Sequence, residues 1–300
     1  MRQDVSPYMS GQPEPAALSA RAARVTVRRL DMADHAALAA LLESDPGRGV
    51  FLADTLERCG VTPPFAGFWG AFAGGGLIAV LMLVGRRAAP FALPGVDLAP
   101  LARVAVSEGL DFTMGQAAEV DALLAALPAG RRVLREEHLL AEHLPQRPRE
   151  TPINPPPATT IRRAVPGDLD ALARLYFRTD GFEHLTWEQL RQTLDGRIRG
   201  LRTYVAETHG QLVSAASTSA EAARAAMIGG VWTAPDARNR GHSTAVVAAL
   251  SRELRGEGRR AFLFYLVDNA PAAAVYARAG YRVAGRWSVA YIAPEGRSPG

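Results

Sequence analysis

Hydrophobic residues recur at helix and strand spacing along two long segments of the chain, which lie on either side of a proline-rich stretch. In the second segment Leu169, Leu172 and Leu175 are three residues apart, as on the buried face of a helix, and an apolar run over Arg260–Val267 is typical of a buried strand. The predicted strands are Thr160–Arg163, Arg202–Glu207, Leu212–Ser219, Ala225–Thr233, Arg260–Val267, Tyr281–Ala284 and Ser288–Ile292. The predicted helices are Asp168–Arg178, Thr186–Arg197, Ser243–Arg255 and Pro271–Arg278.

The first segment follows a similar order. Its predicted strands are Val25–Arg29, Phe68–Phe72, Leu77–Val84, Asp111–Met114 and a strand near Val133–Leu140. Its predicted helices are Ala33–Glu43, Val50–Glu57, Leu98–Ser107 and Ala118–Leu127. Because both segments begin strand–helix–helix–strand–strand, we predict a divergent internal duplication. The fold class is mixed α/β (α+β), with two tandem domains that each hold a mostly antiparallel sheet flanked by helices.

The proline-rich stretch, residues 144–159, predicts the domain boundary, because proline removes backbone donors and fixes φ. We therefore expect a first domain over residues 24–143 and a second over residues 160–300. Residues 1–23 are rich in Pro, Ala and Ser and predict a disordered leader without the apolar core of a secretory signal. We also expect the fragment from Thr159 to the end to fold by itself.

Composition narrows the classes of function. The 300 residues are 48% hydrophobic and 21% charged, which is typical of a globular protein, and the apolar run Gly76–Val84 is too short to span a bilayer. The sequence has no lysine, so a lysine Schiff base is excluded. Its net charge of +4 is spread among acids and bases, which gives little support to nucleic-acid or membrane partners. A homodimer is compatible with the sequence.

Two further features argue against metal chemistry and for a reducing compartment. Cys59 is the only cysteine, so a cytoplasmic location is expected and the thiol is predicted to be a small buried apolar group. In the run EEHLLAEH, His138 and His143 are five residues apart, not four as on a metal-binding helix face, so we predict a polar strand end and no metal site.

The run from Gly229 to Thr244, GGVWTAPDARNRGHST, holds the candidate chemistry. A strand that leads through a short glycine-containing loop into a helix presents unpaired backbone N–H groups and the positive end of the helix dipole, which bind anions. Gly241 permits a positive φ, and Arg238 and Arg240 add charge suited to phosphate oxygens. His242 is expected to be an exposed loop residue, and a solvated loop is the alternative reading for both arginines.

This run resembles the acyl-CoA signature R/Q-x-x-G-x-G/A of the GNAT (GCN5-related) N-acetyltransferases, with Arg238 and Gly241 at the first and fourth positions and Ser243 where Gly or Ala is usual. A second segment, VDNAPAAAVYARAGYRVAG, is similar to the family's N-x-x-A-x-x-x-Y-x-x-x-G-F/Y pattern. Its matching residues are Asn269, Ala272, Tyr276, Gly280 and Tyr281. The resemblance covers most of Thr159–Ile292.

The resemblance implies an acetyl-CoA-dependent N-acetyltransferase that needs no metal and acts by direct transfer on an amine of a small molecule or peptide. It implies that the diphosphate lies on Arg238, Asn239, Arg240, Gly241, His242, Ser243 and Thr244, and that pantetheine pairs with the backbone at Val231, Trp232 and Thr233. Asn269 would bind the cofactor and Tyr276 would protonate the departing thiolate. The structural alternatives are a helix N-cap for Asn269 and simple packing for Tyr276.

The general base is less defined. Glu221, in the turn before a central strand, is one candidate, and Glu183 and His184, between the first two helices of the second segment, are others; each also fits a solvated loop charge. The first segment has no matching glycine loop around Phe91–Val104, so we expect it to be catalytically silent. Two other functions stay open: a non-catalytic acyl-CoA-binding regulatory or scaffold module, and aminoacyl transfer from tRNA, which the glycine loop and the absence of a basic tract disfavour.

Overall fold

A computed structural model describes residues 25–144, 155–177, 179 and 182–293. In the first half the strands are β1 (Thr26–Arg29), β2 (Gly67–Ala73), β3 (Gly76–Val84), β4 (Arg87–Ala92), β5 (Phe112–Gln116) and β6 (Val133–His143). The helices are η1 (Met32–Asp34), α1 (His35–Glu43), α2 (Pro46–Cys59), α3 (Ala99–Ser107) and α4 (Ala117–Leu124). The expected leader and residues 145–154 of the expected linker lie outside the described residues.

The second half repeats this order. Its strands are β7 (Thr159–Arg163), β8 (Thr203–Thr208), β9 (Gln211–Glu221), β10 (Ala225–Thr233), β11 (Arg260–Leu266) and β12 (Tyr281–Ile292). Its helices are η2 (Pro166–Asp168), α5 (Leu169–Tyr176), α6 (Trp187–Gly200), η3 (Pro235–Ala237), α7 (His242–Gly256) and α8 (Ala270–Arg278). Thr186 begins α6 in a reciprocal capping box with Gln189, as expected for Thr followed three residues later by Gln.

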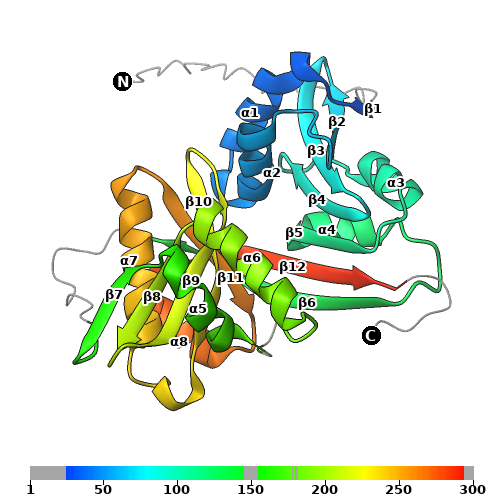
Figure 1. The fold of residues 1–300 in the computed structure, drawn as a ribbon. Coiled ribbons are helices and arrows are strands. Elements are labelled where there is room, and N and C mark those ends of the chain that lie inside the picture. The colour runs from blue at the N-terminus through cyan, green and yellow to red at the C-terminus, as the bar shows by residue number, and fades with distance from the viewer. Residues whose placement is uncertain (1–24, 145–154, 178, 180–181, 294–300) are drawn as a thin grey trace, which may run out of the picture.

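The predicted mixed α/β class with a mostly antiparallel sheet is confirmed, and the two halves contribute to one continuous sheet. Its strand order is β1-β2-β3-β4-β5-β12-β6-β11-β10-β9-β8-β7. The last strand of each half lies beside the fifth strand of the other half: β6 pairs with β11, and β12 pairs with β5. The two exchanged strands also pair with each other from Tyr281↔His143 to Ile292↔Val133, and they bridge the halves in Figure 1.

Helices cover both faces of the second half. On β8, Val205 packs with α5 and α6, whereas the next residue, Ala206, packs with α7. Because successive strand residues point to opposite faces, α5 and α6 lie on one face of the sheet and α7 on the other. The deeply buried positions of α7 include Val246 and Leu250, which follow the four-residue spacing of a helix face.

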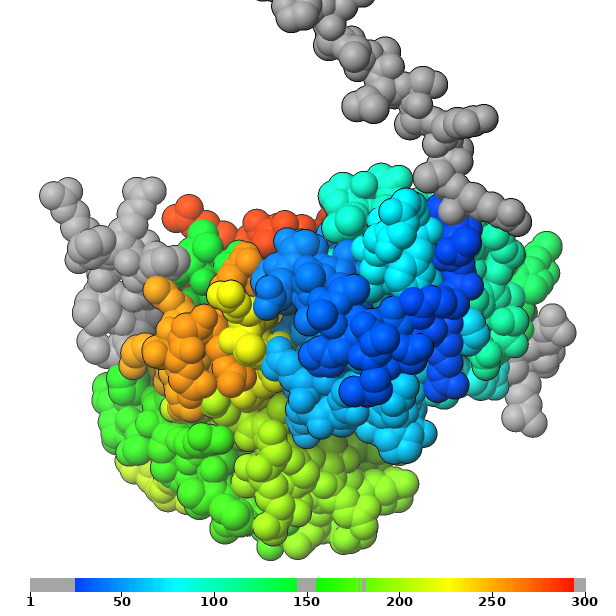
Figure 2. Space-filling view, turned by 90° about the horizontal axis from the view of Figure 1, so that it is seen from above, coloured from blue at the N-terminus to red at the C-terminus, as the bar shows by residue number. Residues whose placement is uncertain are grey.

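The two halves also meet through α2, which packs on the turn between β9 and β10. The Asp54 carboxylate accepts a hydrogen bond from the Glu221 backbone N–H at 3.1 Å, and the Glu57 carboxylate accepts one from the Ala223 N–H at 2.8 Å. Figure 2 shows the blue atoms of the first half directly against the yellow and orange atoms of the second. The halves are therefore joined by shared strands and by a helix-to-turn contact.

The structure corrects three predictions. Arg87–Ala92 forms β4, which the sequence analysis missed because Pro90 argues against a strand; pairing with β5 stops at Ala88, before the proline. The two short strands expected after Tyr281 are one strand, β12, with a register shift between Val283 and Gly285. Cys59 is exposed at the end of α2, not buried.

The strand exchange argues against the expectation that a fragment from Thr159 folds by itself. Such a fragment lacks β6, which lies between β11 and β12 in the sheet. It would leave the backbone of β11 unpaired along Phe262–Leu266. Among the helices of the described chain, none has the length and apolar character needed to cross a bilayer.

Candidate functional site

Strands β10 and β11 separate part of the way along their length. They pair in parallel from Ala225↔Arg260 to Ile228↔Leu263, and the pairing then stops. Beyond this point β10 pairs with β9 through an irregular step between Gly229 and Trp232, where Gly230 has a φ of +59°. Within the described chain the β11-facing edge of β10 after Ile228 has no strand partner, so an extended ligand could pair with it.

The open strand leads into a helix start with free donors. Asn239 and Gly241 adopt positive φ values of +61° and +88°, and α7 begins at His242 without a side-chain cap. In the described chain, no acceptor binds the backbone N–H groups from Asn239 to Thr244; the first helical bond runs from the Ala245 N–H to the Gly241 carbonyl. Six successive N–H groups without an acceptor at a helix N-terminus have the geometry that suits an anion, and binding there stays a prediction.

The loop arginines are exposed beside this site. The Arg238 Nε–H donates to the Thr233 carbonyl at 3.2 Å, and its guanidinium lies 4.8 Å from the centre of the Trp232 ring. Arg238 is thereby held along the loop, while Arg240 extends from it. Both can approach an anion at the helix start by side-chain rotation, and the structure brings Trp232, Thr233 and Arg238 into direct contact.

His242 is buried, with 4% of its surface exposed, so the expectation of an exposed loop residue is wrong. Burial lowers the pKa of its imidazole, and the Arg240 charge lowers this pKa further. The His242 Nδ1 and the Thr244 Oγ1 are both buried without a hydrogen-bond partner in the described structure. Two unpaired polar atoms in the first turn of α7, beside the half-buried Ser243, fit an anionic ligand that completes this site.

Asn269 and Tyr276 lie at opposite ends of α8. Asn269 is exposed, and its Oδ1 accepts the Ala272 N–H at 3.0 Å, which is the N-cap alternative. Tyr276 packs between the rings of Tyr265 and Tyr281, at centroid distances of 5.2 and 6.2 Å. Burial raises the pKa of Tyr276 to about 12, and in the described chain no residue hydrogen-bonds its hydroxyl. The phenol is therefore protonated at neutral pH and free to donate.

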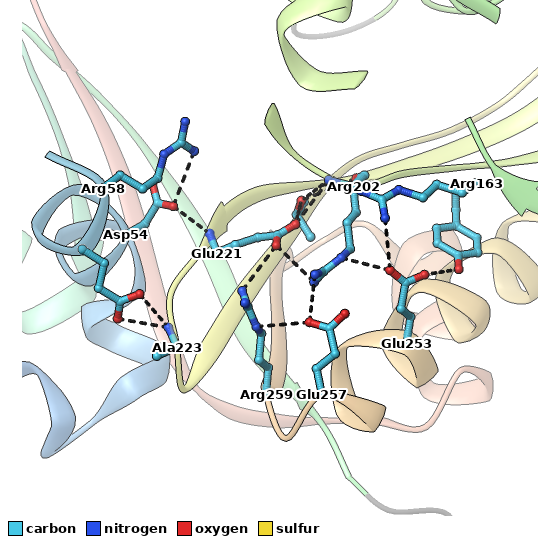
Figure 3. Close-up of polar contacts among 12 residues, drawn as sticks. Asp54, Arg58, Arg163, Arg202, Glu221, Ala223, Glu253, Glu257 and Arg259 are labelled. Atoms are coloured by element: carbon cyan, nitrogen blue, oxygen red, sulfur yellow. Dashed lines mark hydrogen bonds and ion pairs between the residues drawn. The ribbon is translucent and has the colours of Figure 1, made fainter. Parts of the chain in front are cut away.

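Glu221 does not fit the role of general base. It lies opposite Ala226, near the start of β10, whereas the irregular step and the open edge are toward the other end of that strand. Its carboxylate accepts the Thr218 hydroxyl at 2.6 Å and pairs with Arg202 at 3.1 Å and Arg259 at 3.3 Å (Figure 3). Because both carboxylate oxygens of Glu221 are engaged by these partners, the residue stabilises the β9–β10 turn and is not available as a base.

The other two candidate bases, Glu183 and His184, are exposed between α5 and α6. The structure brings neither of them into contact with the open strand edge. The described contacts therefore assign none of the three predicted candidates as the base. Deprotonation of an ammonium by water needs no such side chain.

Two residues at the irregular step of β10, Tyr176 and Arg197, were not predicted from the sequence to have a role there. The Tyr176 hydroxyl donates a short hydrogen bond to the Gly230 carbonyl, and a Cβ built on Gly230 would lie 3.1 Å from Nη1 of Arg197. Burial raises the pKa of Tyr176, so the phenol stays a donor. The glycine pair Gly229–Gly230 within a strand was the available signal, because glycine there often marks a bulge or a close approach.

The comparisons with known proteins concern the fold. Residues 208–290 match a family model described as FR47-like protein. The structure resembles the GCN5-related N-acetyltransferase from Sphaerobacter thermophilus, with a TM-score of 0.62, 20% identity and coverage of 89% of this chain and 95% of that one. It also resembles an acetyltransferase of the GNAT family from Colwellia psychrerythraea, with a TM-score of 0.55, 16% identity and coverage of 90% and 100%.

A tandem GNAT protein from the clavulanic acid biosynthesis pathway has a TM-score of 0.56, 18% identity and coverage of 92% of this chain and 100% of that one. Identities this low show a shared fold and leave the reaction to be argued from the site. A search of the curated proteins by sequence finds no match.

Proposed function

We propose that this chain, which belongs by its fold to the GCN5-related N-acetyltransferase superfamily, transfers an acetyl group from acetyl-CoA to an amine of a small molecule or peptide. The observation that carries the proposal is the run of six free backbone N–H groups from Asn239 to Thr244, directly after a strand with an unpaired edge. A diphosphate would accept hydrogen bonds from these N–H groups, and the amides of pantetheine would pair with the strand edge.

The proposed reaction is a direct transfer. The amine nitrogen attacks the thioester carbonyl, a C–N bond forms and the C–S bond breaks. Tyr276, whose hydroxyl has no partner in the described chain and stays protonated at neutral pH, gives its proton to the departing sulfur and is reprotonated from solvent. The ammonium of the acceptor loses one proton to water before the attack, and the nitrogen loses a second proton to water when the tetrahedral intermediate collapses to the amide. Val231, Trp232 and Thr233 line the strand edge along which pantetheine would lie.

Asn269 has a narrower role in this proposal than the resemblance implied. Its Oδ1 already caps α8, but its side-chain amide donors have no partner within the described residues. One amide group can thus cap the helix and donate to the cosubstrate. The first half contributes no second acetyl-CoA site, because its corresponding helix start and strand edge are occupied by its own side chains.

The test is calorimetric titration of the full chain with acetyl-CoA, followed by an amine panel in which release of the CoA thiol is measured. We expect one acetyl-CoA per chain and acetylated product with at least one class of amine. Binding without turnover against small amines, amino acids and peptides would favour a non-catalytic acyl-CoA-binding module. Absence of binding would reject the assignment of the helix start.

A further inference from the structure

Arg197 is a partly buried cation at the irregular step of β10. It lies on α6, and its guanidinium packs over the ring of Phe182 at 5.1 Å from the ring centre. One terminal nitrogen lies 3.1 Å from the point where a Cβ on Gly230 would be. Burial lowers the pKa of Arg197, which reflects a charge that is poorly solvated by water. The aromatic contact fixes the plane of the guanidinium beside the strand.

The charge of Arg197 has no counterpart in the described chain. No carboxylate there lies within ion-pair distance, and no acceptor there binds its guanidinium N–H groups. Other arginines on the same helix are paired: Arg191 with Asp170, and Arg199 with Asp195 at 2.8 Å. A partly buried cation without a partner is costly, and it is most readily explained by an anion that binds there from outside the chain.

Arg197 lies on the face of the sheet from which an acceptor must approach. The helix start that holds the proposed diphosphate belongs to α7, on one face of the sheet, whereas α5 and α6 cover the other face. Direct transfer requires donor and acceptor to meet at the gap between β10 and β11. An acceptor that enters from the α5–α6 face passes Arg197, next to the bend at Gly230 where Tyr176 holds the backbone.

We propose that Arg197 binds a carboxylate of the acyl acceptor, so that the substrate class is an amine that also carries a carboxylate, as in amino acids. This proposal rests on the proposed acetyl transfer. A planar guanidinium matches a carboxylate with two parallel hydrogen bonds, which fixes the orientation of the acceptor as well as attracting it. Arg197 acts on substrate specificity, while Tyr276 acts on the leaving group.

The test compares matched acceptors in the full-length chain. The panel is the set of amino acids and their carboxamides, in which only the negative charge changes. The wild type is expected to prefer the carboxylates by about 10- to 100-fold in kcat/KM, the range of charge-assisted hydrogen bonds. Arg197→Gln should raise KM for the carboxylates by a similar factor and leave the carboxamides unchanged. Arg197→Lys keeps the charge but loses the planar pair of hydrogen bonds, so its KM for the carboxylates should lie between those of the wild type and of Arg197→Gln.

Arg199→Gln is the matched control, since Arg199 is an exposed arginine on the same helix whose partner is Asp195. This substitution should change neither the KM for the carboxylates nor the KM for the carboxamides. Thermal unfolding followed by circular dichroism separates a folded Arg197→Gln protein from one that does not fold. A wild type that uses carboxylates and carboxamides equally would overturn the proposal, and so would an equal loss of kcat for both in Arg197→Gln, which would place Arg197 at the reacting centre.

A binding measurement separates this proposal from the proposed function. N-acetyl amino acids and their carboxamides are titrated into the chain, with and without CoA, and their affinities are measured by calorimetry. Tighter binding of the carboxylates that is lost in Arg197→Gln supports the anion site even in the absence of turnover. Equal affinities would reject the site while leaving acetyl transfer to be judged by acetyl-CoA titration alone.

Discussion

The two halves of the sheet have helix starts at corresponding places, and these starts differ in the groups that they offer to an anion. At α7 the backbone N–H groups from Asn239 to Thr244 have no partner in the described chain. At α3 the Asp97 carboxylate accepts the Ala99 N–H at 2.9 Å, and Pro100, the second helical residue, has no N–H to offer. A carboxylate at the helix start repels a phosphate and occupies the donor that would bind it.

The gap between β4 and β5 also differs from the gap between β10 and β11, because side chains fill it. Strands β4 and β5 pair only at Arg87↔Phe112 and Ala88↔Thr113, much as β10 and β11 do at their start. In the first half, however, the Ala92 N–H donates to Glu119 at 2.7 Å and the Ala92 carbonyl accepts from Arg48 at 2.9 Å. Glu119 and Arg48 also pair with each other. The backbone groups that a cosubstrate would use are therefore satisfied internally.

This comparison shows that the two halves share a framework and differ in the positions that the proposed site uses. The strand separation, the turn and the following helix are retained in the first half, while side chains fill the hydrogen-bonding positions. The helix after the fifth strand differs as well, because α4 carries no tyrosine where α8 carries Tyr276. The first half thus supports the second half structurally, through β6 and α2.

The largest expected effect tests that support. A chain that begins at Thr159 lacks β6 and leaves β11 unpaired on one side, so we expect it to lose cooperative unfolding and acetyl-CoA binding entirely. A chain that begins at Arg131 keeps β6 and should unfold cooperatively at a lower Tm than the full protein. Circular dichroism melting of both chains measures the difference. Equal and cooperative melting of the two fragments would contradict the importance of the exchanged strand.

The sequence predicted the elements well where hydrophobic spacing and capping chemistry agree, as in β10 and in α6 after Thr186. It predicted a glycine-containing loop that leads into a helix start, because glycine, arginine and a following amphipathic helix are local signals. The strand exchange was not predictable, because β6 pairs with residues more than 100 positions away and nothing local marks its partner. Arg197 was missed for a similar reason: its lack of a partner becomes visible only in three dimensions.

The second prediction compares two glycines of the same geometry. Gly241 and Gly95 have φ values of +88° and +78°, and a Cβ on either meets no atom within 4 Å. Gly241→Asp places a carboxylate at the open helix start and should weaken acetyl-CoA binding by at least about 100-fold, or about 2.7 kcal/mol. Gly95→Asp introduces the same kind of backbone strain in the turn before α3, three residues before its N-cap Leu98, and should leave the affinity unchanged. The acetyl-CoA affinity of both folded variants is measured by calorimetry. An equal loss of affinity in both would mean that backbone strain, and not the carboxylate at the helix start, weakens binding.

The third prediction concerns the tyrosine that distinguishes α8 from α4. Tyr276→Phe keeps the ring packing and should lower kcat by about 10²-fold with little change in acetyl-CoA affinity. Because the pKa of Tyr276 is raised to about 12, its proton is retained as pH rises through the neutral range, so the wild-type kcat should show no loss of this acid between about pH 7 and about pH 10. Tyr265→Phe is the aromatic neighbour control and should keep kcat within about 3-fold. Normal turnover in Tyr276→Phe would assign the proton to another donor.

The smallest expected effect asks which difference silences the first half. Asp97→Ala removes the exposed carboxylate that accepts the Ala99 N–H just before α3 and should cost at most about 1 kcal/mol in the free energy of unfolding, as loss of one hydrogen bond does. It should not create a second acetyl-CoA site, because Pro100 still lacks an N–H and Arg48 and Glu119 still occupy the edge of β4. Denaturant unfolding measures the first effect and calorimetric stoichiometry the second. A second bound acetyl-CoA would show that one carboxylate is enough to close a site, whereas a stoichiometry of one places the cause in the filled strand edge and the proline together.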